Sequence, residues 1–152
     1  MSATLSVGVQ AADFDVGAEL AKLEPLGGGG VASFTGVVRG GNGLTALELE
    51  HHPGITETMI RRIAEQAAGR WPLLGVTAIH RHGRLAPGDR IVLVAAASPH
   101  RSAALEATAF LIDWLKTRAP FWKKEYFADG TSRWVEARAA DDEAAKRWIE
   151  QG

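Results

Sequence analysis

One long apolar segment places the strongest constraint on how this chain can fold. Residues 98–119, SPHRSAALEATAFLIDWLKTRA, form the clearest helix prediction in the sequence. Ser98 can cap its start, Pro99 suits the first helical position, and Pro120 prevents the helix from continuing. The segment is apolar nearly all round, so we expect the helix to be buried.

The first half of the chain is predicted to contain strands and two helices. A short helix ends near Pro25, and the glycine run at residues 27–30 is interpreted as a flexible loop, because no phosphate-binding pattern follows it. The sequence GGNG is rich in residues that tolerate positive φ, and it predicts the turn of a β-hairpin. Helical spacing of apolar residues predicts a second helix over 56–71, with Thr56 as its N-cap. The predicted strands of this half are residues 4–9 and the two hairpin arms, 31–39 and 44–52.

The second half adds further strands around the long helix, and a final helix begins with acidic residues near position 141. The predicted strands are residues 75–85, 89–98, 121–127 and 133–139. Strands and helices do not alternate regularly enough for a doubly wound sheet. We therefore predict an α+β fold with mixed or antiparallel sheets and flanking helices. The length of 152 residues predicts a single domain over 1–152.

Overall charge and cysteine content exclude several classes of function. The net charge is -1, so no global field attracts nucleic acid or anionic lipid, and any anion site must come from local clustering. The chain has no cysteine, so any sulfur chemistry needs sulfur from another molecule. No signal peptide or membrane-length apolar run is present, and we expect a cytoplasmic protein with no membrane or nucleic-acid partner.

Cations at the start of the long helix suggest an anion site. A helix N-terminus already carries unpaired N–H groups and partial positive charge, yet His100 and Arg101 fall in its first turn. A bound phosphate or carboxylate would make this arrangement favourable. The alternative is an arginine paired with a neighbouring carboxylate.

The far end of the same helix carries Lys116 and Arg118, and Lys123 and Lys124 follow after an Ala-Pro-Phe-Trp segment. If the segment after Pro120 is extended, only Lys123 shares a face with Phe121. An amine held near other cations and apolar rings can act as acid, base or nucleophile. A solvated basic cluster with a purely structural role remains the alternative.

The histidines and aromatic residues give weaker indications. His80 and His82 would share a strand face, and His51 and His52 are adjacent, but no HExxH motif or cysteine completes a metal site. The expectation is therefore no metal and no cofactor. Gly-x-Ser-x-Gly is absent, which argues against a serine hydrolase. The interleaved Trp and Lys residues of FWKKEYF could stack bases, although the near-neutral net charge argues against a nucleic-acid partner.

Several motifs together resemble the catalytic large subunit of molybdopterin synthase, the MoaE family. They are SFTGVVR, LEHHPG, SPHRSAAL, LKTRAPFWKKE, RWVEAR and KRW, which run in order from about residue 31 to 148. The resemblance implies an α/β-hammerhead-type fold and a homodimer that binds two small ubiquitin-like sulfur-carrier subunits. Each carrier would insert a C-terminal thiocarboxylate into a pocket of the large subunit. Its sulfur would pass to cyclic pyranopterin monophosphate, precursor Z, to form the dithiolene of molybdopterin.

The same resemblance implies roles for individual residues. Lys116 would act beside the carrier's terminal carbonyl, and Lys123 would assist proton transfer or stabilise an anion at the pterin. Phe34 would line the channel for the carrier tail, and the substrate anion would be bound by Arg39, His100, Arg101 and Arg138. The motifs leave out the first thirty residues, and the GGNG turn departs from the family pattern. The alternative function is a non-catalytic module that binds a partner's C-terminal tail and an anionic metabolite.

Overall fold

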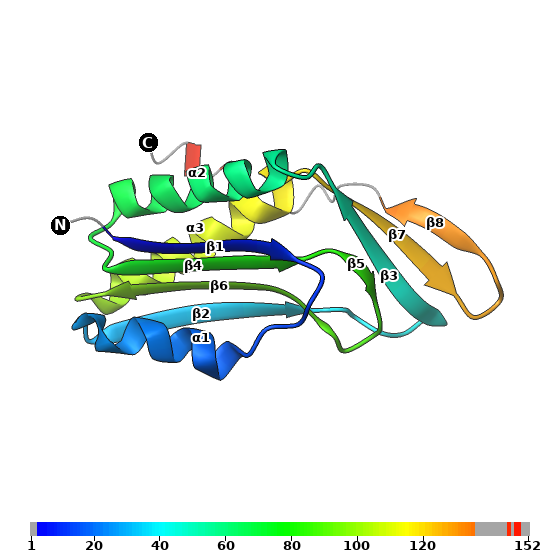
Figure 1. The fold of residues 1–152 in the computed structure, drawn as a ribbon, viewed down its shortest axis with the longest axis horizontal. Coiled ribbons are helices and arrows are strands. Elements are labelled where there is room, and N and C mark those ends of the chain that lie inside the picture. The colour runs from blue at the N-terminus through cyan, green and yellow to red at the C-terminus, as the bar shows by residue number, and fades with distance from the viewer. Residues whose placement is uncertain (1–2, 136–145, 147, 150–152) are drawn as a thin grey trace.

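The computed structural model describes residues 3–135, 146, 148 and 149, and this part of the chain forms two four-stranded sheets. The first sheet has the order β1-β4-β6-β2, formed by β1 (Thr4–Gln10), β4 (Gly75–Arg81), β6 (Arg90–Ser98) and β2 (Gly30–Val37). The second has the order β5-β3-β7-β8, formed by β5 (Gly83–Leu85), β3 (Leu44–His51), β7 (Phe121–Phe127) and β8 (Ser132–Val135). The helices are α1 (Val16–Leu23), the short 3-10 helix η1 (Glu24–Leu26), α2 (Ile55–Arg70) and α3 (Arg101–Arg118). Figure 1 shows the second sheet projecting from one end of the first.

The predicted α+β class is confirmed. In the first sheet β1 and β4 are parallel, whereas the other strand pairs of both sheets are antiparallel, so the first sheet is mixed. No helix in the described part of the chain is long and apolar enough to cross a bilayer. The single domain over 1–152 stays a prediction.

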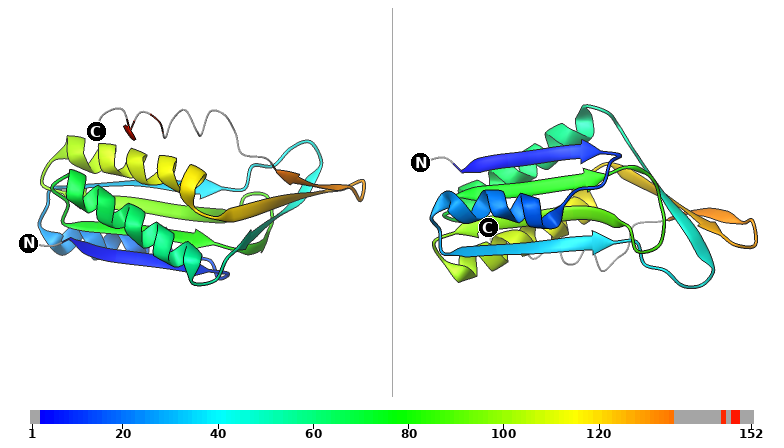
Figure 2. Two further views of the ribbon diagram at one scale, coloured as in Figure 1. Left: turned by 90° about the horizontal axis from the view of Figure 1, so that it is seen from above. Right: turned by 60° about the horizontal axis from the view of Figure 1, so that its bottom comes forward.

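Helices cover both faces of the first sheet, which explains why β6 is apolar at almost every position. Helices α2 and α3 lie on one face and α1 lies on the other (Figure 1, Figure 2). Val92 and Val94 point into the large core with α2 and α3, whereas Leu93 and Ala95 pack in two smaller clusters on the opposite face, beside α1. A strand that is buried on both sides has no reason to alternate with polar residues.

The long helix α3 forms as predicted, except that its N-cap and first helical residue are two positions later and one face is left open. His100 takes the extended N-cap conformation, and the Ser98 hydroxyl accepts a hydrogen bond of 3.1 Å from the His100 N–H. Pro99 therefore precedes the helix. Phe110 and Leu111 are fully buried, but Leu105 is 58% exposed. The expectation that the helix is buried all round is wrong, because α3 covers a sheet and does not cross the centre of the core.

The predicted hairpin between residues 31–39 and 44–52 is wrong, although both strands exist. Strand β2 pairs with β6 in the first sheet, while β3 pairs with β5 and β7 in the second. The Val38 N–H donates to the Asp89 carbonyl at 2.8 Å, so the chain continues along β6 before it leaves the first sheet. Gly41, Asn42 and Gly43 do have positive φ, as expected for GGNG. The local turn chemistry was predicted correctly, but the turn connects two sheets.

One further local prediction needs correction, and another, the glycine loop, gains a detail. Gly54 occupies the N-cap position of α2, and the buried Thr56 hydroxyl donates to the His52 carbonyl at 2.9 Å instead of capping the helix. The glycine run is a loop over residues 27–29, as predicted, and within it Gly28 is closely packed, because a Cβ on Gly28 would lie 2.7 Å from the Ser98 carbonyl oxygen. Real Cβ atoms do not approach backbone oxygens so closely, so the absence of a side chain at Gly28 permits this contact with the end of β6.

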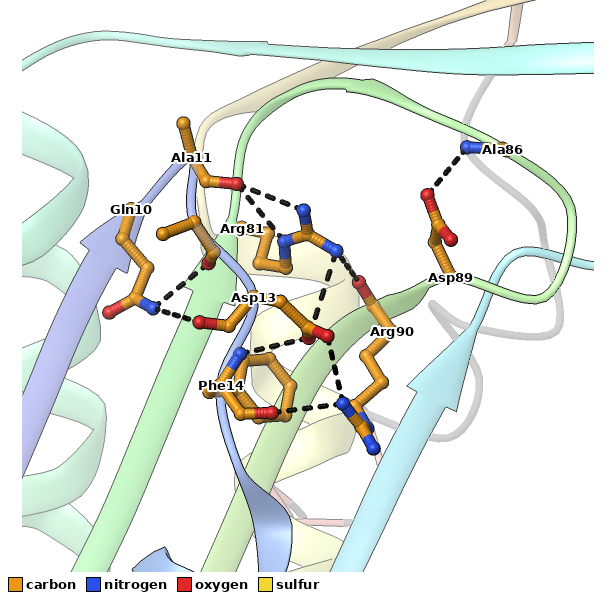
Figure 3. A network of polar contacts seen from close by, with 9 residues as sticks. Gln10, Ala11, Asp13, Phe14, Arg81, Ala86, Asp89 and Arg90 are labelled. Carbon is orange, nitrogen blue, oxygen red and sulfur yellow. Dashed lines mark hydrogen bonds and ion pairs between the residues drawn. The ribbon is translucent and has the colours of Figure 1, made fainter.

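A network of polar contacts fixes the end of β4, as Figure 3 shows. The Arg81 guanidinium donates to the Ala11 carbonyl at 3.0 and 3.1 Å and to the Arg90 carbonyl at 3.0 Å. Arg90 in turn pairs with Asp13 at 2.8 Å. The hydrogen bond from the Phe14 N–H, together with Arg90 and Arg81, lowers the pKa of Asp13. The backbone at Arg81 is therefore held by several elements at once.

The described residues include only part of the C-terminal segment for which a strand and a helix were predicted. Residues 146, 148 and 149 are helical, and the buried Trp148 ring contacts Trp71 and Phe110 at centroid distances of 5.7 and 5.6 Å. Strand β8 confirms the start of the predicted strand over 133–139. The rest of that strand, most of the final helix and Arg138 lie outside the described residues.

Candidate active site

The two lysines of the LKTRAPFWKKE motif lie on either side of a sharp connection between α3 and β7. Lys116 is exposed in the last turn of α3, and only Ala119 and Pro120 separate this helix from β7. Lys123 is partly buried on β7 and pairs with Leu49 of β3. Leu49 is 1% exposed, so Lys123 is on the strand face that is turned toward the core. Lys124, the next residue, is on the other face.

A buried histidine joins this site from a different sheet. His80, near the end of β4, is 6% exposed and stacks on the Phe121 ring at a centroid distance of 3.7 Å and an interplanar angle of 19°. Burial lowers the pKa of His80 to about 3, its hydrogen bond to Arg81 acts in the opposite direction, and the charges of Lys116 and Lys123 lower it further. Both lysines therefore lie close enough to act electrostatically on one neutral imidazole.

Two more imidazoles lie beside this stack. The His51 ring is 5.9 Å from Phe121 and 4.5 Å from His82, measured between centroids. His51 Nδ1 lies 3.1 Å from the Thr56 hydroxyl, whose single proton is donated to the His52 carbonyl. The hydroxyl must accept from His51, so Nδ1 carries a proton. Burial and the neighbouring His51 lower the pKa of His82.

No group of three or more His, Cys, Asp or Glu side chains suited to a metal ion occurs within the described ranges. The His80 ring stacks on Phe121, whereas the His82 ring contacts His51.

The predicted anion-binding residues fall into two separate regions of the chain. Strands β2 and β4 run in the same direction, so Arg39, just after β2, is at the same end of the first sheet as His80. Phe34 is 42% exposed on β2, an edge strand of that sheet. His100 and Arg101 are exposed at the opposite end of α3 from Lys116. At 1.5 Å per residue, the fifteen residues between Arg101 and Lys116 span about 22 Å of helix.

Comparison with known proteins decides the family. A family profile described as "MoaE protein" matches residues 9–118, which is more than half of the chain. This chain belongs to the MoaE family. The "Molybdopterin synthase catalytic subunit" of Mesorhizobium japonicum is 56% identical over 154 residues, covering 97% of each chain. The profile match begins at residue 9, so the family pattern extends into the first thirty residues, where the sequence motifs gave no sign of it.

Solved structures agree with this assignment. The MoaE protein from Burkholderia ambifaria MC40-6 superposes with a TM-score of 0.80 and 47% identity, covering 97% of this chain and 98% of that one. The molybdopterin synthase from Staphylococcus aureus gives a TM-score of 0.79 and 29% identity, covering 86% and 96% of the two chains. The family and the fold predicted from the motifs are confirmed.

Sequence reasoning placed Phe121 on the same strand face as Lys123, but it did not connect His51 or His80 with the lysines of this MoaE chain. The histidines were considered only as metal ligands, and Phe121 only as a guide to strand facing. A usable signal was present, because His80 lies near the end of a largely apolar strand, and a buried polar residue there needs a specific partner. Which partner it has depends on how the two sheets meet.

Proposed function

We propose that this chain is the catalytic subunit of a molybdopterin synthase. It would transfer sulfur from the C-terminal thiocarboxylate of a small ubiquitin-like carrier to cyclic pyranopterin monophosphate, forming the dithiolene. The observation that carries this proposal is the grouping of Lys116 and Lys123 around a buried, neutral His80 in a chain that has no cysteine. The carrier must then supply the sulfur, and this chain supplies the positive charge. We expect the reaction to take place in the cytoplasm.

The two lysines would have different roles. When sulfur leaves the thiocarboxylate, negative charge develops on the acyl oxygen, and the exposed Lys116 ammonium is suited to stabilise it. The partly buried Lys123 would donate or accept a proton at the pterin. Lysine can do both because its ammonium group can release a proton, whereas arginine keeps its charge.

The substrate phosphate would be bound by Arg39, His100, Arg101 and Arg138, and Phe34 would line the channel for the carrier tail. One chain cannot bring all of these to Lys116, because His100 and Arg101 lie about 22 Å away along α3. We therefore propose a homodimer in which the partner subunit contributes these two residues to each site. A two-fold dimer makes the exchange reciprocal, so both sites are completed together.

The test uses purified thiocarboxylated carrier and cyclic pyranopterin monophosphate, with dithiolene formation as the measurement. Lys116→Ala should abolish product, and Lys123→Arg should do so as well if Lys123 transfers a proton. Lys124→Ala is the matched control, because the Lys124 amine packs 5.4 Å from the Tyr126 and Trp134 ring centroids on the other face of β7. The alternative is a non-catalytic module that only binds the carrier tail. In that case the wild type would form no dithiolene, and Lys123→Arg would bind the carrier as well as the wild type does.

The dimer can be tested by mixing two inactive variants. Arg101→Ala and Lys116→Ala subunits, exchanged at equal concentrations, should recover about a quarter of wild-type activity, because half of the dimers then hold one intact site. Absence of any recovery, with exchange verified by mass spectrometry, would show that each chain forms its own site.

A further inference from the structure

No chemical step of the proposed sulfur transfer is assigned to the buried imidazole of His80, yet His80 contacts the segment that joins the two lysines. Lys116 ends α3 and Lys123 belongs to β7, so their separation depends on the path of the chain between them. Phe121 is the first residue of β7, and its N–H donates to the Ala119 carbonyl at 2.9 Å. The position of Phe121 is therefore tied to the position of the connection between α3 and β7.

His80 holds that ring from the other sheet. The two rings stack nearly parallel, with centroids 3.7 Å apart, whereas the His51 ring contacts Phe121 from farther away, at 5.9 Å and tilted by 42°. Flat aromatic contacts of this kind favour a narrow range of geometries. Because His80 is on β4 and Phe121 on β7, the stack also connects the first sheet to the second at the lysines.

The state of the His80 ring is fixed by its own hydrogen bond. Its Nδ1 lies 2.8 Å from the Arg81 carbonyl, which can only accept, so Nδ1 is the protonated nitrogen. The Arg81 carbonyl is itself held in place, because the Arg81 side chain is bonded to Ala11 and Arg90 (Figure 3). A neutral ring with protonated Nδ1 leaves Nε2 as an acceptor and adds no third positive charge beside Lys116 and Lys123.

Other side chains would fail at one of these tasks. Phenylalanine could stack on Phe121, but it would leave the Arg81 carbonyl without its hydrogen bond. A lysine or arginine would add charge to a site that already repels it, as the effect of Lys116 and Lys123 on His80 demonstrates. Alanine would remove both the stack and the hydrogen bond.

We propose that His80 is a positioning residue for the sulfur transfer: by stacking on Phe121 it fixes the connection that sets Lys116 and Lys123 relative to each other. This inference rests on the proposed function, since it assigns His80 to the same two lysines. His80 acts through Phe121 and does not itself react with the carrier or the pterin.

The kinetic test compares three variants with the wild type in the complex with thiocarboxylated carrier. His80→Ala should lower kcat by about 100-fold, as expected for a displacement of about 1 Å at a reacting group, with KM for the carrier changed less than about threefold. His80→Phe keeps the stack and should recover most of that loss. His82→Ala is the matched control and should leave kcat unchanged, because the His82 ring contacts His51 and not Phe121. Thermal unfolding establishes that each variant is folded at the assay temperature.

A second measurement does not depend on activity. Nitrogen NMR of the imidazoles in the wild-type protein should show His80 neutral, with the proton on Nδ1, from about pH 5 to about pH 8. Titration of His80 near neutrality would overturn the inference, and so would wild-type kcat in His80→Ala or an equal loss in His80→Phe. If the wild type itself forms no dithiolene, the proposed function fails, while the NMR result still tests the state of His80.

Discussion

Lowering the pH from about 7 to about 5 should destabilise this protein through His80. In the unfolded chain this imidazole has its ordinary pKa of 6.5, whereas burial in the folded protein lowers the pKa to about 3. Between these two values the unfolded chain binds a proton that the folded protein does not. The stability contributed by the neutral ring is therefore complete above the unfolded pKa, and it is lost as the pH falls from about 6.5 toward 3.

The expected size follows from the difference between the two pKa values. Between about pH 7 and about pH 5 the protonation of His80 in the unfolded state should reduce the free energy of unfolding by about 2 kcal/mol. For a chain of this length, that corresponds to a decrease of about 4 to 8 °C in Tm. Asp13 and Asp129 have pKa values below 3.8, so they do not titrate in this range. His82 contributes in the same direction as His80.

The assay is urea unfolding followed by tryptophan fluorescence at a series of pH values, for the wild type and for His80→Phe. The variant cannot take up the proton, so its unfolding free energy should depend less on pH by about 2 kcal/mol over the same interval. Equal pH dependence in the two proteins would refute the reasoning, because it would mean that the folded His80 ring is protonated as readily as in the unfolded chain.

Three further predictions concern stability and are measured by chemical unfolding. Gly28→Ala should destabilise the protein by about 1 to 3 kcal/mol, because its Cβ would lie 2.7 Å from the backbone oxygen of Ser98. Gly69→Ala, in α2 with no atom within 4 Å of its new Cβ, should stabilise by about 0.5 to 1 kcal/mol, and a loss there would contradict the contact argument for Gly28. Thr56→Val should lower the free energy of unfolding by about 1 to 3 kcal/mol, because the fully buried hydroxyl both donates to a backbone carbonyl and accepts from His51. An unfolding free energy equal to that of the wild type would show that these hydrogen bonds are not formed.

The elements of this fold were predictable from local patterns, whereas their partners were not. Helix α3 and strand β7 were predicted because each is specified by residues within its own segment: apolar spacing, and the prolines at 99 and 120 that bound the helix. The pairing of β2 with β6 could not be read from β2, since both β3 and β6 offer an alternating or apolar strand of similar length. The GGNG turn is compatible with a hairpin and with a crossing between sheets, and only the burial of Val38 against the first sheet decides between them.

In the candidate site, too, the residues close together in the sequence were predictable, whereas their contacts with distant segments were not. Lys116 and Lys123 were predictable because they lie in one continuous motif with a proline between them. His80 reaches them from a strand more than thirty residues earlier in the sequence, and its role depends on a stack between two sheets. The close contact of Gly28 with Ser98 could not be predicted, because nothing in a run of four glycines distinguishes Gly28 from its neighbours.

The short connection from α3 to β7 gives the molecule a mechanical property. Helix α3 packs on the first sheet and β7 lies in the second, so one lysine belongs to each half of the molecule. Any ligand that tilts one sheet against the other must also change the spacing of the two amines. Residues added at the GGNG crossing would lengthen a loop that holds neither lysine, whereas residues added at Ala119 and Pro120 would directly change the distance between the two amines.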